Sequence, residues 1–224
     1  MHVGRMGYLL VALVLLQGCS YEKTLVRKEA EASTYDPASM ARIRLFSSPE
    51  LSASYQPGAT CEAFHPSKKN DTKIAARQYK KEQHWLLWAK TSLDLRGMEP
   101  EDYQNRVIGM PETKQTRNLR NDRVGYDEFV IPAGKPTVVM INFTAHDSTR
   151  NSDSWCFPPP VALTPEAGKD YEISLVWERP NIFVANCRLS VAELVGQEVV
   201  KDVREVKTAL CAENKNFDYD TVNP

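Results

Sequence analysis

Alternating apolar and polar residues recur along the chain, and this pattern predicts a protein built mainly of β-strands. In the segment Ala41–Phe46, for example, Ala41, Ile43 and Leu45 alternate with two arginines and a phenylalanine. Successive side chains of a strand point to opposite faces of its sheet, so one face of this segment is expected to enter a core. The same criteria predict further strands at Thr60–Phe64, Asp127–Ile131, Thr137–Phe143, Cys156–Leu163, Tyr171–Glu178 and Phe183–Leu189.

Two details refine this prediction. Pro165 fixes φ and Gly168 tolerates a positive φ, so the segment between Cys156–Leu163 and Tyr171–Glu178 is expected to close a hairpin. Thr137–Phe143 is almost wholly apolar, as expected of a strand that is covered on both faces.

One long segment has the spacing of a helix instead. Apolar residues recur every three, four or seven positions between Ala75 and Leu93, which predicts a helix that covers the sheet. Trp85 and Trp88 widen its apolar side, and lysines lie beside it. The same features fit an interfacial helix with two Trp rings at the headgroup level of a membrane. Both interpretations stay open, and the second makes Trp85 and Trp88 candidate membrane contacts.

A second helical stripe runs from Val195 to Leu210. Ser190 and Glu193 have the spacing of a capping box, which would open this helix directly after the last strand. Alternatively, Ser190–Val195 continues that strand and the helix begins near Gln197.

Together these elements predict an antiparallel β-sandwich with one or two appended helices. We expect a single sandwich-like domain over residues 41–211, with a helical or loop insertion at about 67–123. Residues 19–40 are polar and are expected to form a lipidated tether, and residues 212–224 a flexible tail. No strand–helix–strand rhythm favours a parallel sheet.

Cys19 is the residue that says most about location. A basic residue, Arg5, precedes the apolar run Tyr8–Leu16, and Leu-Leu-Gln-Gly leads to Cys19. The run is too short to cross about 30 Å of hydrocarbon as a helix, which takes about 20 residues. It is typical of a secretory signal, and its end resembles the lipobox of bacterial lipoproteins, whose cysteine is diacylated, cleaved and N-acylated. Residues 1–18 are then a lipoprotein signal peptide. The alternative is an ordinary signal peptide with an incidental cysteine.

The charge balance argues against nucleic acid as a partner. The 224 residues include 28 Lys and Arg and 29 Asp and Glu, which gives a net charge of −1 with neutral histidines. Cleavage before Cys19 would remove 18 residues with Arg5 as their only charge, so the mature net charge is −2. Nucleic-acid phosphates call for clustered positive charge, which this balance does not favour.

Four further cysteines, Cys61, Cys156, Cys187 and Cys211, predict two disulfides, because an exported chain with an even number of cysteines is typical of a disulfide framework. Three pairings are possible from the sequence alone. A metal site is the competing interpretation, but no C-x-x-C or H-x-x-x-H spacing brings two ligands together. We therefore expect no metal.

Several segments taken together resemble a set of small, poorly characterised Gram-negative envelope lipoproteins. They cover most of the mature chain and are Ala41–Phe46 (ARIRLF), Ile108–Pro111 (IGMP), Phe129–Pro136 (FVIPAGKP), Leu163–Tyr171 (LTPEAGKDY) and the strand around Cys187. In that set, the cysteine before the T-P-x-x-G-K-D-Y segment and the one after it recur together. The resemblance thus implies a Cys156–Cys187 bridge, which leaves Cys61 with Cys211. It also implies the outer membrane, because Ser20 rather than Asp follows the lipidated cysteine.

Candidate catalytic chemistry is sparse, so we expect a non-enzymatic binding or scaffolding module of the cell envelope. His146, Asp147 and Ser148 are the residue types of a triad, but triad members come from separate segments, and no G-x-S-x-G elbow is present. The expected partners are the membrane, through acyl chains on Cys19, and an envelope protein or glycan met by a domain that faces the periplasm. No cofactor is expected beyond the covalent lipid. The alternative is an envelope hydrolase with a site near His146.

Overall fold

The computed structural model describes residues 23–48, 50–64, 73–74, 104–119, 124–147, 149–181, 184–213 and 219–222. Over these residues the protein is mainly β, with two short helices, α2 (Glu29–Ala32) and α4 (Lys114–Asn118). The strands are β1 (Thr24–Arg27), β2 (Met40–Ser47), β3 (Leu51–Pro57), β4 (Lys73–Ile74), β5 (Gln104–Val107), β6 (Glu112–Thr113), β7 (Gly125–Pro132), β8 (Thr137–Asp147), β9 (Ser152–Cys156), β10 (Val161–Leu163), β11 (Asp170–Asn181), β12 (Val184–Val195), β13 (Val200–Glu205), β14 (Ala209–Glu213) and β15 (Tyr219–Val222).

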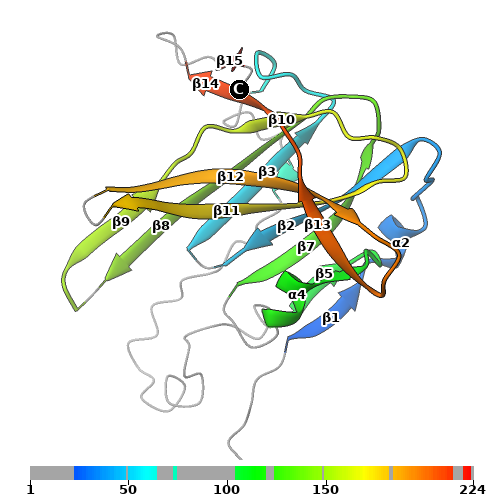
Figure 1. Ribbon diagram of the computed structural model, residues 1–224, viewed down its shortest axis with the longest axis horizontal. Coiled ribbons are helices and arrows are strands. Elements are labelled where there is room, and N and C mark those ends of the chain that lie inside the picture. Colours follow the sequence, from blue (N-terminus) through cyan, green and yellow to red (C-terminus); the bar gives the residue numbers. More distant parts are fainter. Residues whose placement is uncertain are drawn as a thin grey trace, which may run out of the picture.

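Two sheets make up the architecture (Figure 1). The first sheet has the strand order β1-β5-β7-β2-β11-β12-β13-β6. The second sheet has the order β15-β14-β10-β8-β3-β4, with β9 paired to β8. Figure 1 shows the long β11–β12 hairpin of the first sheet crossing in front of β8 and β3 of the second. The fold is therefore sandwich-like, with the two helices appended to it.

Apolar side chains from both sheets share one core. In β2, Ala41, Ile43 and Leu45 are all buried, which confirms the alternation expected for this strand. Each fully buried Ile or Leu side chain contributes about 1.5–3 kcal/mol. The second sheet completes the same core with Ala53, Tyr55, Val139, Ile141, Val161 and Leu163.

The start of β8 is covered on both of its faces, as its apolar sequence predicts. Val139 lies in the core between the sheets, and its neighbour Val138 packs in a second cluster on the opposite face. That cluster contains Cys61, Phe64 and Cys211. It explains one wrong prediction: residues 61–63 form a turn rather than a strand, and Cys61 and Phe64 at the two ends of this turn cover β8 from outside.

The predicted hairpin at Thr164–Gly168 is also wrong. β10 pairs with β8 and β14 in the second sheet, whereas β11 pairs with β2 and β12 in the first. The segment is a crossing between sheets. It is held by Gly168 N–H donating to the Met40 carbonyl and Gly134 N–H donating to the Pro165 carbonyl, each at 2.8 Å.

The C-terminal helix is replaced by strands. β12 continues through Ser190–Val195, as the alternative interpretation has it, and β13 and β14 follow instead of a helix. Val199 and Val203, two members of the presumed helical stripe, are exposed. β-branched residues fit strands well, so their spacing alone does not distinguish the two structures.

The first sheet is not purely antiparallel. β1 with β5, β5 with β7, β2 with β11, and β6 with β13 are parallel pairs. The central parallel pair arises because the chain visits the second sheet between β2 and β11, so the two strands are not joined by a hairpin.

Segments expected to be irregular also contribute to the sheets. Residues 24–27 of the expected tether form β1, and α2 follows. Residues 219–222 of the expected tail form β15, which pairs with β14. Part of the expected insertion forms β4, β5, β6 and α4. The helix expected between Ala75 and Leu93 lies outside the described residues.

Candidate functional site

Three charged residues lie side by side on the outer face of the first sheet. Arg44 in β2 is directly opposite Glu128 in β7 and Glu172 in β11. Its guanidinium donates to Glu128 Oε1 from Nη2 at 2.7 Å and from Nε at 3.1 Å, and to Glu172 Oε1 from Nη1 at 2.5 Å. Arg44 is only 1% exposed. Burial disfavours its charged form, but the two carboxylates outweigh this and raise the pKa of Arg44.

The segment Ile108–Pro111 covers this buried ion cluster. The backbone N–H groups of Ile108, Gly109 and Met110 all donate to Glu128 Oε2, at 2.8 to 3.1 Å. The Pro111 carbonyl accepts from Arg44 Nη2 at 2.7 Å. Because the charged groups of this cluster are buried and bind one another inside the fold, the cluster has a structural role and holds the segment Ile108–Pro111 on the sheet.

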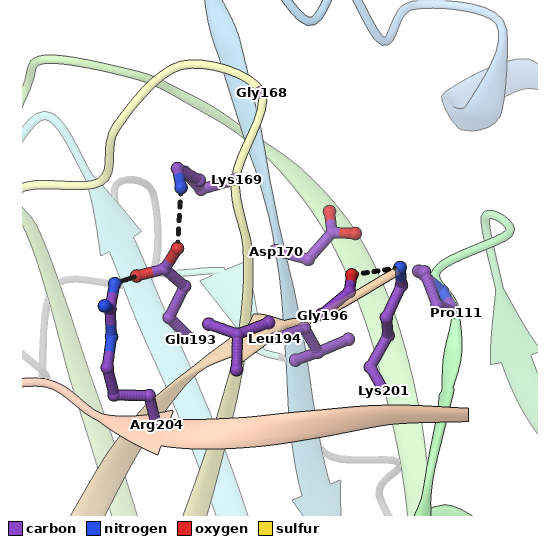
Figure 2. A pocket seen from close by; sticks show the side chains of 10 residues that line it. Pro111, Gly168, Lys169, Asp170, Glu193, Leu194, Gly196, Lys201 and Arg204 are labelled. Carbon is purple, nitrogen blue, oxygen red and sulfur yellow. Dashed lines mark hydrogen bonds and ion pairs between the residues drawn. The ribbon is translucent and has the colours of Figure 1, made fainter. Parts of the chain in front are cut away.

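A cavity of about 520 Å³ opens beside this cluster, at the ends of β12 and β13. Figure 2 shows Lys169 and Arg204 on one side of it and Lys201 with Pro111 on the other, with Leu194 between them. The volume is in the range of small-molecule sites. The remaining lining comes from Gly168, Asp170, Glu193, Val195 and Gly196. We call this cavity the basic pocket.

Glu193 links two of the cations in the basic pocket. Its Oε1 accepts from Lys169 Nζ at 2.7 Å and its Oε2 from Arg204 Nη2 at 2.6 Å (Figure 2). The Glu193 side chain is buried, while those of Lys169 and Arg204 are partly exposed. The hydrogen bond from Lys169, with a further one from Arg204, lowers the pKa of Glu193 despite burial. The same bonds raise the pKa of Lys169 and of Arg204.

The second carboxylate of the basic pocket is also occupied. Arg42 Nε and Nη2 donate to the two oxygens of Asp170 at 2.6 and 2.7 Å. Lys201 Nζ donates to the Gly196 carbonyl at 2.6 Å and has no ion pair among the described residues. Four cations therefore face two carboxylates. Glu166 lies near Lys169 and Arg204 and offsets part of the excess. The pocket keeps a net positive charge.

A second cavity, of about 390 Å³, lies beneath α2. It is lined mainly by apolar and aromatic residues, among them Met40, Tyr55 and Phe129. Lys28 Nζ lies 3.9 Å from the centre of the Phe129 ring, a cation–π contact. Burial raises the pKa of Tyr55, so its hydroxyl stays protonated.

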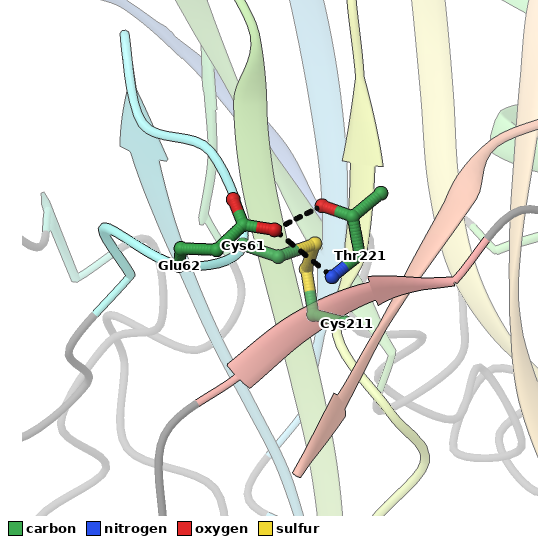
Figure 3. Close-up of a disulfide and its surroundings, with 4 residues drawn as sticks. All are labelled: Cys61, Glu62, Cys211 and Thr221. Atoms are coloured by element: carbon green, nitrogen blue, oxygen red, sulfur yellow. Dashed lines mark hydrogen bonds between the residues drawn. A yellow bond between two sulfur atoms is a disulfide. The ribbon is translucent and has the colours of Figure 1, made fainter. Parts of the chain in front are cut away.

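The structure joins Cys61 to Cys211 and Cys156 to Cys187, the pairing that the resemblance implies. The first bridge ties the turn after β3 to β14 and is fully buried. Figure 3 shows Glu62 beside it, accepting hydrogen bonds from Thr221 Oγ1 at 2.7 Å and Thr221 N–H at 3.0 Å. The second bridge joins β9 to β12 and so connects the two sheets.

The other candidate site residues are dispersed or lie outside the described residues. His146 Nδ1 is 2.8 Å from Asp153 Oδ1 on the β8–β9 hairpin, where both side chains are exposed, and His146 lines neither cavity described above. Cys19, Trp85, Trp88 and Ser148 are outside the described residues. In the part of the chain that is described, no three His, Cys, Asp or Glu residues form a metal site, and no helix is long and apolar enough to span a bilayer.

Sequence reasoning missed the basic pocket. Lys169 and Asp170 belong to a segment that stands out in the sequence for its turn residues and for the resemblance to envelope lipoproteins, and Glu193 has the spacing of a helix cap. The available signal was the density of charge in β13, where Lys201, Asp202, Arg204 and Glu205 are four of its six residues.

Comparisons of the chain with protein-family models, with curated proteins and with solved structures found no match.

Proposed function

We propose that this protein is a lipid-anchored, non-enzymatic binding module of the bacterial envelope, held at the outer membrane with its domain in the periplasm. The basic pocket would bind an acidic group, carboxylate or phosphate, of an envelope protein or glycan. The observation that carries the proposal is the set of four cations around two carboxylates that are already paired. An acidic ligand there would meet Lys201, whose partner among the described residues is a neutral carbonyl, and the exposed side chain of Arg204.

The anchoring part of the proposal is supported by Cys19 and the preceding lipobox-like sequence. Two or three acyl chains make an anchor effectively permanent, since each buried methylene contributes about 0.8 kcal/mol. The two disulfides also suit an oxidising compartment outside the cytoplasm.

The hydrolase alternative has one supporting contact, the His146–Asp153 pair. A general base needs a nucleophile within reach and a site that excludes water. The exposure of both side chains favours the binding proposal instead.

The binding proposal is tested by photo-crosslinking in intact cells. A photoreactive residue replaces Val199, which is exposed in the loop next to the basic pocket, and adducts are identified by mass spectrometry. We expect adducts that disappear when Lys201→Ala and Arg204→Ala are added. The matched control is Lys114→Ala with Arg117→Ala, which also removes one lysine and one arginine, both on α4 and both from exposed ion pairs, with Asp202 and Glu112.

Adducts that survive the loss of Lys201 and Arg204, or that disappear equally in the control, would contradict a role for the basic pocket. The anchor is tested separately by metabolic palmitate labelling. The wild-type chain should be labelled and Cys19→Ser should not. An unlabelled wild-type chain would overturn the anchoring proposal.

A further inference from the structure

The folded body begins very close to the proposed lipid anchor. Lys23 is buried, and its ammonium group donates to the carbonyls of Val124 and Leu119. β1 follows directly and pairs along its whole length with β5. The body is therefore fixed from Lys23 onwards, only four residues after Cys19.

Four residues of extended chain span at most about 14 Å, at 3.3–3.6 Å per residue. The polar zone of a bilayer leaflet occupies about 5–7 Å of that distance. If Cys19 is acylated, which is part of the proposed function, Lys23 cannot lie far outside the headgroups. Linkers that let a domain move freely above a membrane are much longer, because the reach of a flexible chain grows only with the square root of its length.

β1 also exposes apolar side chains at the edge of a sheet, a surface that proteins usually cover. It is the edge strand of the first sheet as far as the described residues show. Leu25 is 60% exposed and Val26 40% exposed, and these neighbours point to opposite faces of the sheet. An exposed apolar edge strand invites association with other chains, and proteins normally cover or charge such edges.

We propose that β1 is the membrane-facing edge of the protein, with Leu25 and Val26 in contact with the lipid headgroup and upper acyl region. The length of chain between Cys19 and Lys23 selects the membrane as the occupant of this edge. β14 and β15 lie at the opposite end of the molecule from β1 (Figure 1), so this end points away from the membrane.

The charges near β1 indicate what kind of contact this is. Arg27 pairs with Glu29 at 2.9 Å, and both side chains are exposed. The strand therefore has little net charge of its own to offer to anionic lipids. The contact is apolar and enforced by the short linker, so it should persist at high salt, where contacts between exposed charges are screened.

The test uses the full lipidated chain in vesicles of phosphatidylethanolamine and phosphatidylglycerol. A photoreactive residue replaces either Leu25 or Val222, and lipid adducts are measured by mass spectrometry. Val222 is the matched control because it is an exposed apolar residue, 45% exposed, on the edge strand β15 at the other end. We expect at least a tenfold excess of lipid adducts at Leu25 over Val222, unchanged by 0.5 M salt.

A second variant tests the role of the linker. Twelve Gly and Ser residues inserted between Ser20 and Tyr21 add a root-mean-square reach of about 20 Å, and should lower the yield of lipid adducts at Leu25 severalfold. If the protein floats with the vesicles but Leu25 and Val222 give equal adduct yields, the proposal that β1 faces the membrane is wrong, while the proposed anchor stands. A wild-type chain that neither floats nor is labelled by palmitate would instead overturn the anchor on which the inference rests.

Discussion

Arg44 and Glu128 face each other across β2 and β7, and the guanidinium contacts only one of the two carboxylate oxygens. Glu128 Oε1 accepts both bonds from Arg44, while Oε2 accepts three backbone N–H groups from the segment Ile108–Met110. A single buried side chain thus joins the central strand to the segment that covers it. Because the two oxygens of Glu128 bind different partners, the position of the segment Ile108–Met110 depends on a charged side chain of the sheet.

Replacing Arg44 with Met should destabilise the protein strongly. The change leaves Glu128 and Glu172 buried without their cation, and breaking a buried pair in this way costs about 3–5 kcal/mol. The measurement is the free energy of unfolding from urea denaturation followed by circular dichroism. Arg42→Met is the matched control, because Arg42 has a single carboxylate partner, Asp170, among the described residues, also donates to the Gly109 carbonyl, and is partly exposed. The control should cost less, about 1–3 kcal/mol. A larger loss in the control than in Arg44→Met would contradict this account.

Gly109→Ala should destabilise the cover segment through its backbone. Gly109 has φ of +99°, a conformation that an alanine adopts only with strain of about 1–3 kcal/mol. Space is not the problem, since the nearest atom to an added Cβ is Arg27 Nη1 at 3.6 Å. Urea denaturation measures the loss. Gly58→Ala, at φ of +78° and with open space around it, is the control and should cost about 1 kcal/mol. Equal stability of Gly109→Ala and the wild type would show that the strain is absent.

The strands of the core were predictable because burial of one face leaves a period of two in the sequence. In β2, Ala41, Ile43 and Leu45 show this period and are buried. The same rule puts Arg44 on the opposite face, where a charged residue ordinarily meets solvent. It failed there because the segment Ile108–Pro111, which follows β5, folds over that face, and its backbone amides satisfy Glu128. A hydropathy pattern cannot predict that a charged residue is buried when hydrogen bonds from a distant segment satisfy it.

The basic pocket was not predictable for a related reason. Its residues come from the crossing before β11 and from the β12–β13 pair, and they meet only because β13 pairs with β12. The sequence favoured a helix there, which would have placed Arg204 on a different surface. Glu193 illustrates the difficulty: the spacing from Ser190 suits a helix cap, whereas the structure uses Glu193 as the shared acceptor of two cations.

The two disulfides should differ in their contribution to stability. Cys61 and Cys211 are 150 residues apart, and Cys156 and Cys187 are 31 apart. By loop-closure entropy, these bridges contribute about 5 and about 4 kcal/mol respectively. The double variants Cys61→Ala with Cys211→Ala and Cys156→Ala with Cys187→Ala should follow this order in urea denaturation. The first pair is also fully buried, which adds a packing loss in the same direction. Greater stability of the first double variant than of the second would contradict the ranking.

Glu62 should titrate far below the usual range of a glutamate. Hydrogen bonds from Thr221, first from its hydroxyl, lower the pKa of Glu62 from 4.5 to about 2. Because the folded pKa is depressed, the stabilisation of β15 by Glu62 is present above about pH 4.5 and is lost as the pH falls through about 2. The measurement is a ¹³C NMR titration of the Glu62 carboxyl carbon. Thr221→Val removes the hydroxyl donor and keeps the branched shape, so it should move the midpoint upward, towards 4.5. A wild-type midpoint that already lies near 4.5 would show that the Glu62–Thr221 contact does not hold β15 in solution.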